Sequence, residues 1–236
     1  DALDCSGKDV LVVKTYDDVS VFEEATSSNV CLSVLNRSVS GTPPNNYLEN
    51  FDAVIWTTGT DLANIDENDA AALIDYYDKK GKVIVEGSDV AFKHQNNELM
   101  QTVLHSELGT DLGFSVTSTT ELEQLKVNIT RSHPLISGLQ NLLLFNETLN
   151  PFPDSIRAYN GSVELAEWTG LDTTGSAIVA YEDEQKKSLF LPFSINALEE
   201  TERSTLASNS LNWLLEENSV DITPSKIEYK NFKTPI

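Results

Sequence analysis

The sequence predicts an α/β fold: a doubly wound, mainly parallel sheet flanked by helices. Two apolar runs, at residues 10–15 and 53–57, are typical of strands that are buried on both faces. An amphipathic helix follows the second run and leads into another buried run at 82–86, so residues 51–92 form one predicted strand–helix–strand unit. The chain has 236 residues and 40% hydrophobic content, which is enough to bury one full core.

The first elements alternate in the way this fold requires. We expect a strand at 10–15, a short helix at 17–27, a second strand at 30–35 and a Pro- and Asn-containing loop at 41–46. The helix of the central unit carries the strongest signals. Asp66 is a good N-cap, acidic residues fill the first turn, and Gly81 follows the last turn. Its apolar positions repeat at helical spacing: Ala70, Leu73, Ile74 and Tyr77.

The second half predicts shorter elements. A helix is expected at about 97–108, followed by strand-like pieces at 114–116, 125–129, 142–145 and 163–166. Residues 176–181 and 188–193 predict a hairpin around 183–185, and a long helix follows at 201–217. We therefore expect a β-rich insertion or hairpin in the second half. Trp56 and Trp213 lie in apolar patterns and are expected in the core.

One domain is expected at 1–218, with 219–236 as a linker or the first strand of a following module. The first residues contain no signal peptide, so a secreted protein would have to be mature or an excised fragment. The formal net charge is −21, from 37 acidic and 16 basic residues, which argues against nucleic acid and anionic lipid as partners. No apolar run approaches the length of about 18 residues that a membrane-spanning helix needs.

Several phrases resemble a known family. VIWTTG at 54–59, YDKKGKVIVEGSD at 77–89 and HPLISGL at 133–139 are similar to motifs of the class I glutamine amidotransferase-like fold. More narrowly, they resemble the non-catalytic domains of that fold in secreted or cell-surface bacterial and archaeal proteins. The resemblance covers residues 8–216. It implies an extracellular or cell-surface location.

The enzymes of this family place a Cys in a G-x-C-x-G turn, and a His and a Glu after the last strand. Here the turn after 82–86 contains Gly87, Ser88 and Asp89, and the late phrase is Pro192-Phe193-Ser194. A nucleophile needs an adjacent base to take its proton. The resemblance therefore does not imply amidotransferase activity, and we expect no catalytic residue.

Polar residues follow the predicted parallel strands, where this architecture binds ligands. The candidate ligand rim consists of Asp17, Asp18, Thr58, Gly59, Asp61, Glu86, Ser88 and Asp89. One hypothesis is a pocket for a neutral hydroxylated ligand or a cation. The alternative is that these residues only cap strands and helices.

Two sharper hypotheses use the same region. Ser88 is a candidate nucleophile, although Glu86 and Val90 stand where the glycines of a G-x-S-x-G turn belong. Asp61, Asp66, Glu67 and Asp69 are oxygen donors for a calcium ion, but their spacing is not an EF-hand and the helix dipole explains three of them. With no G-x-G-x-x-G or Walker loop, we expect no cofactor, and we assign no metal site.

Cys5 and Cys31 precede and open two strands that we expect to be neighbours. We predict a disulfide between them, with two buried free thiols as the alternative.

The favoured function is a non-enzymatic binding or scaffold domain, accessory to a larger extracellular or cell-surface protein. Its partner is an unknown protein or a small neutral ligand such as a carbohydrate. The alternatives are a hydrolase using Ser88 or a strand-end carboxylate, and an oligomerisation domain.

Overall fold

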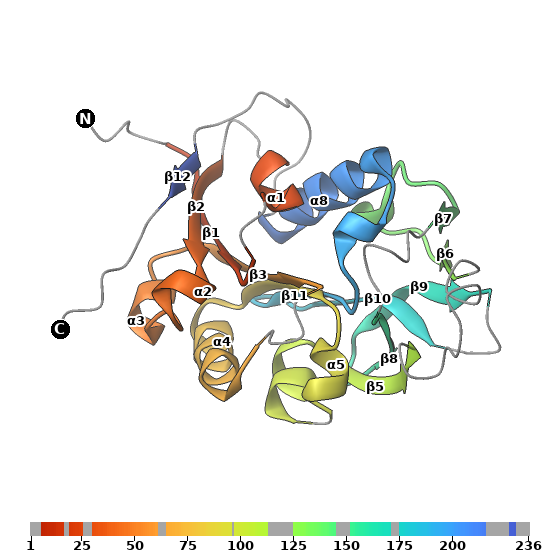
Figure 1. Ribbon diagram of the computed structural model, residues 1–236, viewed down its shortest axis with the longest axis horizontal. Coiled ribbons are helices and arrows are strands. Elements are labelled where there is room, and N and C mark those ends of the chain that lie inside the picture. Colours follow the sequence, from red (N-terminus) through yellow and green to blue (C-terminus); the bar gives the residue numbers. More distant parts are fainter. Residues whose placement is uncertain are drawn as a thin grey trace.

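The computed structural model describes residues 6–16, 19–25, 30–60, 65–95, 97–112, 125–144, 152–170, 175–215 and 227–229. One large mixed sheet runs through this part of the chain (Figure 1). Its parallel half has the order β12-β2-β1-β3-β4-β11. The strands are β12 (Ile227–Tyr229), β2 (Val30–Asn36), β1 (Lys8–Lys14), β3 (Ala53–Gly59), β4 (Lys82–Gly87) and β11 (Lys187–Leu191).

The sheet continues beyond β11 with antiparallel pairs, in the order β10-β9-β6-β7. These strands are β10 (Ser176–Glu182), β9 (Val163–Thr169), β6 (Lys126–Ile129) and β7 (Leu142–Leu144). Off this path, β8 (Asp154–Ala158) pairs with both β10 and β5 (Ser106–Asp111). The predicted hairpin at 176–181 and 188–193 is confirmed by the antiparallel β10–β11 pair.

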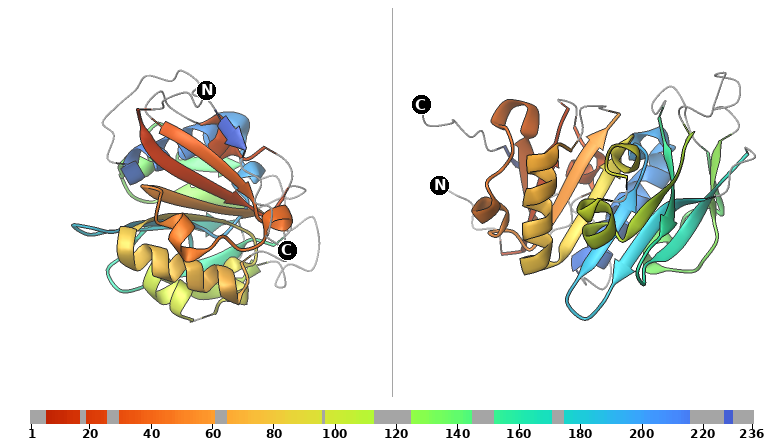
Figure 2. Two further views of the ribbon diagram at one scale, coloured as in Figure 1. Left: turned by 90° about the vertical axis from the view of Figure 1, so that its left-hand side faces the viewer. Right: turned by 90° about the horizontal axis from the view of Figure 1, so that it is seen from below.

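Helices cover both faces of the parallel half (Figures 1 and 2). On one face lie α1 (Val21–Glu24) and the long α8 (Glu200–Leu215); on the other lie α4 (Glu67–Lys80) and α5 (Val90–Lys93). Further short helices among the described residues are α2 (Arg37–Ser40), α3 (Asn45–Leu48), a π-helix at Leu99–Val103 and 3₁₀-helices at Pro134–Ile136 and Ile195–Ala197. A large, mainly parallel sheet between helices is therefore the observed fold class.

Each central strand contributes apolar side chains to two hydrophobic cores, one on each face of the sheet. Val10 and Val12 of β1 belong to the core under α1 and α8, whereas Leu11 and Val13 belong to the core under α4. Because side chains alternate along a strand, a continuous apolar run is what a sheet covered on both faces requires. Trp56 and Trp213 are both buried, which confirms the prediction that they are core residues.

Helix α4 forms as predicted. The Asp66 carboxylate caps it by accepting from the N–H groups of Asn68 and Asp69. The Asp69 carboxylate accepts in turn from the N–H of Asp66, which completes a capping box. Gly81 ends it with a φ of 74°, a left-handed conformation that glycine adopts without strain.

Two helix predictions are wrong in extent. The predicted helix at 97–108 is a π-helix that ends at Val103, because His105 takes a φ of 45° and Ser106 starts β5 against β8. Of the predicted helix at 17–27, the described residues 19–25 contain only α1, whose first turn is fixed by a capping box between Ser20 and Glu23, while 17–18 and 26–27 lie outside the described residues. Strand β8 was not predicted, and residues 114–116 lie outside the described residues.

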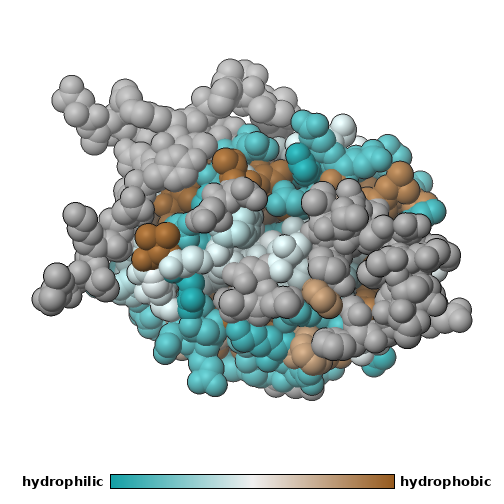
Figure 3. Space-filling model, viewed as in Figure 1, coloured by the Kyte–Doolittle hydropathy of each residue, from teal (hydrophilic) through white to brown (hydrophobic). Residues whose placement is uncertain are grey.

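Residues 227–229 of the C-terminal segment pair in parallel with β2, at the edge of the same sheet. The division of the chain at residue 218 stays a prediction. None of the described helices has both the length and the apolar character needed to cross a bilayer. The face seen in Figure 3 is mostly hydrophilic where it is described, with apolar residues scattered over it.

Candidate functional site

Polar side chains gather at the carboxyl ends of the parallel strands, as the rim prediction requires, but they are buried. Glu86, the penultimate residue of β4, is fully buried and accepts a short hydrogen bond from the Thr57 hydroxyl of β3. Its other oxygen accepts from the backbone N–H of Ile195 at 2.6 Å, beyond β11. Thr57 in turn contacts the Tyr16 hydroxyl at 2.8 Å. Three segments are thus tied together by one carboxyl group.

Burial raises the pKa of Glu86 to about 7, although hydrogen bonds from Thr57 and from the backbone N–H of Ile195 lower it. Burial, with a smaller contribution from the Glu86 charge, also raises the pKa of Tyr16. A buried pair of Lys14 and Glu23, 3.0 Å apart, extends the polar layer toward α1. In these contacts each polar group has a partner within the protein. Tyr16, Thr57 and Glu86 therefore form a polar cluster in the core, which we call the Glu86 seam.

The other rim residues fall into three groups. Thr58, Gly59 and Ser88 are buried beside Glu86, and only Asp89 is partly exposed. Asp17, Asp18 and Asp61 lie outside the described residues. The structure therefore brings together the predicted strand ends of β3 and β4, while ligand binding by the rim stays a prediction.

The turn after β4 is tight, and its strained residue is Asp89. Asp89 has a φ of 57°, which is uncommon for a residue with a side chain. Gly87 has a φ of 144°, and a Cβ there would lie 1.8 Å from Thr58 Oγ1, so only glycine fits. Sequence reasoning placed the nucleophile position at Ser88, but the strained strand-to-helix position belongs to Asp89 and Ser88 is fully buried.

All three histidines of the chain are engaged in local structure. His94 contacts the Ile65 carbonyl at 2.9 Å, and His105 contacts the Tyr77 hydroxyl at 3.1 Å. His133 accepts from the Leu135 N–H at 3.3 Å. Burial lowers the pKa of each ring.

A cluster of three carboxylates lies at the turn Gly87-Ser88-Asp89 after β4, which we call the elbow. Two members of this cluster were not predicted from the sequence. Asp89, Asp111 and Asp154 each place one oxygen within 4.8 Å of the others. They come from the β4–α5 turn, the end of β5 and the start of β8. No motif links them in sequence, and β8 was not predicted, so the only available signal was Asp89 in the rim.

The acidic start of α4, considered above for calcium, is held by a basic side chain. The guanidinium of Arg37 forms ion pairs with both Asp66 and Asp69, the second at 2.9 Å. Asp69 also accepts from the Thr42 hydroxyl at 2.7 Å. These carboxylates therefore have structural partners, and Asp61 lies outside the described residues.

The predicted disulfide is described at one end only. Cys31 is disulfide-bonded, whereas Cys5 lies outside the described residues. The Cys5–Cys31 pairing stays a prediction.

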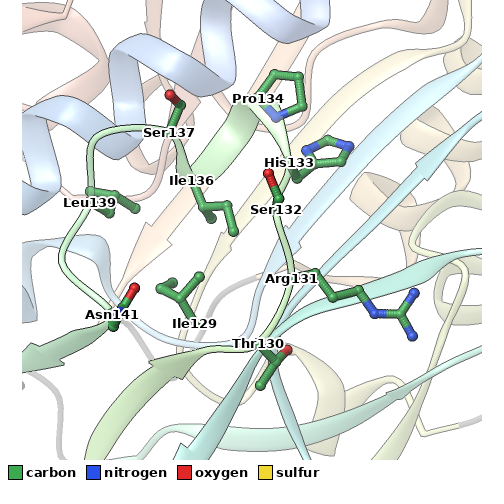
Figure 4. Close-up of a pocket in the computed structure, with 10 residues that line it drawn as sticks. All are labelled: Ile129, Thr130, Arg131, Ser132, His133, Pro134, Ile136, Ser137, Leu139 and Asn141. Carbon is green, nitrogen blue, oxygen red and sulfur yellow. The ribbon is translucent and has the colours of Figure 1, made fainter.

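Two of the pockets among the described residues lie beside the antiparallel strands. The larger, about 620 Å³, lies in the loop from Ile129 to Asn141, which contains the HPLISGL phrase. Figure 4 shows Ile129, Ile136 and Leu139 inside the curve of this loop and the Arg131 side chain pointing away from them.

The second pocket, about 370 Å³, is aromatic. His105 stacks on Tyr181 with ring centroids 3.5 Å apart, and Tyr77, Tyr159 and Asn160 complete much of the lining. The Lys186 ammonium lies 4.8 Å from the centre of the Tyr77 ring.

No protein-family model matches this chain, and no curated protein shows significant similarity to it. Solved structures share its fold. Cytoplasmic protein STM1381 from Salmonella typhimurium LT2 aligns over 88% of this chain and 99% of its own, with a TM-score of 0.59 and 14% identity. Cytoplasmic protein STM3548 from Salmonella typhimurium covers 86% and 98%, with a TM-score of 0.56 and 12% identity.

A Thermoplasma acidophilum protein, described as belonging to GMP synthase, matches 88% of this chain and 96% of its own. Its TM-score is 0.56 and its identity 11%. At such identities the likeness shows the fold alone. The chain is therefore an α/β protein of glutamine amidotransferase-like fold.

The prediction of an extracellular or cell-surface location is wrong on this comparison. Both Salmonella proteins carry the name cytoplasmic protein.

Proposed function

We propose that this chain is a non-enzymatic binding domain built on the glutamine amidotransferase-like fold. One observation carries the proposal: each of the three histidines is committed to a structural hydrogen bond, and Ser88 is fully buried. A serine or cysteine nucleophile needs an accessible position and a base within hydrogen-bond reach. In this proposal the antiparallel strands form a β-rich insertion in the second half of the domain.

The aromatic pocket beside His105 is the proposed ligand site. Tyr159 and Tyr181 are partly exposed, and Gln101 and Asn160 add amide groups at its wall. Aromatic faces and amide groups, with the opposite charges of Asp183 and Lys186 in the same lining, suit a small neutral hydroxylated ligand such as a carbohydrate. We therefore place the ligand in the neutral or carbohydrate class and propose an accessory role for the domain.

Two experiments test these statements separately. A fluorophosphonate probe and a glutaminase assay on wild type and Ser88→Ala should show no labelling and no turnover. Activity lost in Ser88→Ala would overturn the non-enzymatic proposal. A panel of neutral mono- and oligosaccharides, followed by NMR, should give shifts in wild type that Tyr181→Ala loses and Leu139→Ala in the other pocket keeps. Loss of the shifts in both variants, or their retention in both variants, would overturn the pocket assignment.

A hydrolase that uses a strand-end carboxylate is the second candidate. Asp89 stands at the strained elbow position and is partly exposed, and burial together with the Asp111 charge raises its pKa to about 6. A carboxyl that titrates near neutrality suits general acid–base work. Turnover of a chromogenic glycoside or ester that disappears in Asp89→Asn would favour this candidate.

An oligomerisation domain is the third candidate. Strand β7 ends the path of paired strands in the described sheet, and Leu142 and Leu144 are exposed on it. An exposed apolar edge strand is a template for pairing with another chain. A dimer in light scattering that Leu144→Lys dissociates would favour this candidate.

A further inference from the structure

The carboxylate cluster at the elbow is assembled by strand pairing. In the antiparallel β5–β8 pair, Asp111 lies directly opposite Asp154. Like charges that face each other across a strand pair are destabilising. The turn after β4 then brings a third carboxylate, Asp89, within 4.8 Å of both. The fold therefore concentrates negative charge where packing alone would favour neutral residues.

Asp154 gives a second, independent sign of a missing partner. Its side chain is fully buried, and one carboxylate oxygen, Oδ2, accepts from the N–H of Phe92 at 3.0 Å. The other oxygen, Oδ1, has no hydrogen-bond partner among the described residues. Asp89 Oδ1 is likewise without one in the same part of the chain. A buried polar atom that lacks a partner is costly, so such atoms ordinarily have a ligand, an ion or a water.

A basic side chain does not fill this role for two of the three residues. Within the described residues, neither Asp89 nor Asp154 forms an ion pair with Lys, Arg or His. This differs from the acidic start of α4, where Arg37 neutralises Asp66 and Asp69. Asp89 and Asp154 therefore retain carboxylate oxygens for a cation.

We propose that Asp89, Asp111 and Asp154 bind a hard divalent cation of the Ca²⁺ or Mg²⁺ class at the elbow after β4. The donors are all carboxylate oxygens, which these ions prefer, and no His or Cys belongs to the set as zinc would favour. Water supplies the remaining ligands on the partly exposed side formed by Asp89 and Asp111. The site lies apart from the aromatic pocket and does not depend on the proposed function.

The competing occupant is a proton. Burial and the neighbouring charges of Asp89 and Asp111 raise the pKa of Asp154 to about 8, so without a cation its carboxyl is protonated at neutral pH. A site that only shares protons shows no response to divalent ions.

Thermal unfolding of chelator-treated protein tests the proposal. Ca²⁺ or Mg²⁺ at about a hundredfold excess over its dissociation constant should raise the Tm of wild type by about 5–10 °C. Asp111→Asn and Asp154→Asn should weaken the apparent affinity at least about tenfold, because each removes one charged ligand. Asp9→Asn makes the same charge change at an exposed residue and should keep the full response.

Terbium luminescence tests where in the protein the ion binds. The Trp168 indole N–H donates to the Asp154 carbonyl at 2.9 Å, so an ion in the cluster lies near a sensitising ring. Wild type should sensitise Tb³⁺ and lose the signal when Ca²⁺ is added, whereas Trp168→Phe should lose the signal and keep the Ca²⁺ shift in Tm. If Asp154→Asn does not fold, Asp111→Asn at the partly exposed position decides.

The proposal is overturned if sodium chloride of equal ionic strength gives the same rise in Tm as the divalent ion. It is also overturned if the aspartate variants respond as wild type does, since the response then reflects the overall charge of −21.

Discussion

Two buried carboxyl groups lie near one end of the sheet, and they differ in how their oxygens are satisfied. Glu86 accepts hydrogen bonds on both oxygens, from Thr57 and from the N–H of Ile195. Asp154 is equally buried, yet one of its oxygens is without a hydrogen-bond partner among the described residues, and two further carboxylates lie near it. Burial alone therefore does not distinguish a structural acid from a candidate ligand; completeness of hydrogen bonding does.

Removal of the Glu86 carboxyl should cause the largest loss of stability. Glu86→Ala leaves the Thr57 hydroxyl and the Ile195 N–H without their acceptor, at about 1–3 kcal/mol for each buried group. We expect the free energy of unfolding to fall by about 3–5 kcal/mol in urea titrations followed by circular dichroism. Glu86→Gln keeps the size and one acceptor and should cost clearly less. Equal losses in the two variants would contradict this explanation.

A methyl group at Gly87 should have the next largest effect. The Cβ of Gly87→Ala would meet Thr58 Oγ1 at 1.8 Å, next to the Glu86 seam, and its φ of 144° is strained for alanine. A loss of about 2–4 kcal/mol is expected on the same scale. Gly41→Ala is the matched control, because Gly41 has a positive φ of 73° and open space around it. Similar losses at the two glycines would show that backbone strain alone is responsible.

The pH dependence of stability should sharpen the comparison. The pKa of Glu86 rises from 4.5 to about 7 on folding, so between these pH values the folded state holds a proton that the unfolded state has lost. Stability therefore falls as pH rises from 4.5 to 7, by about 3 kcal/mol for this group. Subtraction of the Glu86→Gln profile isolates its contribution. A difference that does not change over this range would refute the assignment.

The smallest effect is expected at the elbow. In a chelating buffer, Asp89→Asn removes a carboxylate charge beside Asp111 and keeps a residue that tolerates the positive φ. Because Asp89 is partly exposed, we expect a gain of only about 0.5 kcal/mol in the free energy of unfolding. A clear loss of stability would mean that the Asp89 charge has a structural partner.

Local signals predicted the parallel half of the fold well. Apolar runs gave β1, β3 and β4, and the Asp66 and Gly81 caps gave α4. The π-helix and β5 were missed because Val103 and Leu104 fit a helical pattern, while the break comes from a left-handed His105. Strand β8 has no clear periodicity of its own and is defined by its neighbours β5 and β10.

In the candidate site, too, some residues are marked by local sequence signals and others are placed only by long-range strand pairing. Glu86 and Asp89 were identified because strand ends of a parallel sheet meet at one edge. Asp111 and Asp154 belong to strands whose register arises only from long-range pairing, so no local pattern marks them. Sequence also did not show that Thr58, Glu86 and Ser88 are buried, because that depends on the segment after β11 packing over them.

The pairing of β12 with β2 has a consequence for synthesis of the chain. Strand β2 is made early, but the strand that covers its outer edge at Leu32, Ser33 and Val34 comes from residues 227–229. Until that segment leaves the ribosome, this edge carries open backbone groups and is a template for pairing with other chains. Among the described strands, edge closure is thus the last sheet contact that translation permits, and a nascent chain stalled before residue 227 is expected to aggregate more readily than one in which β12 has paired.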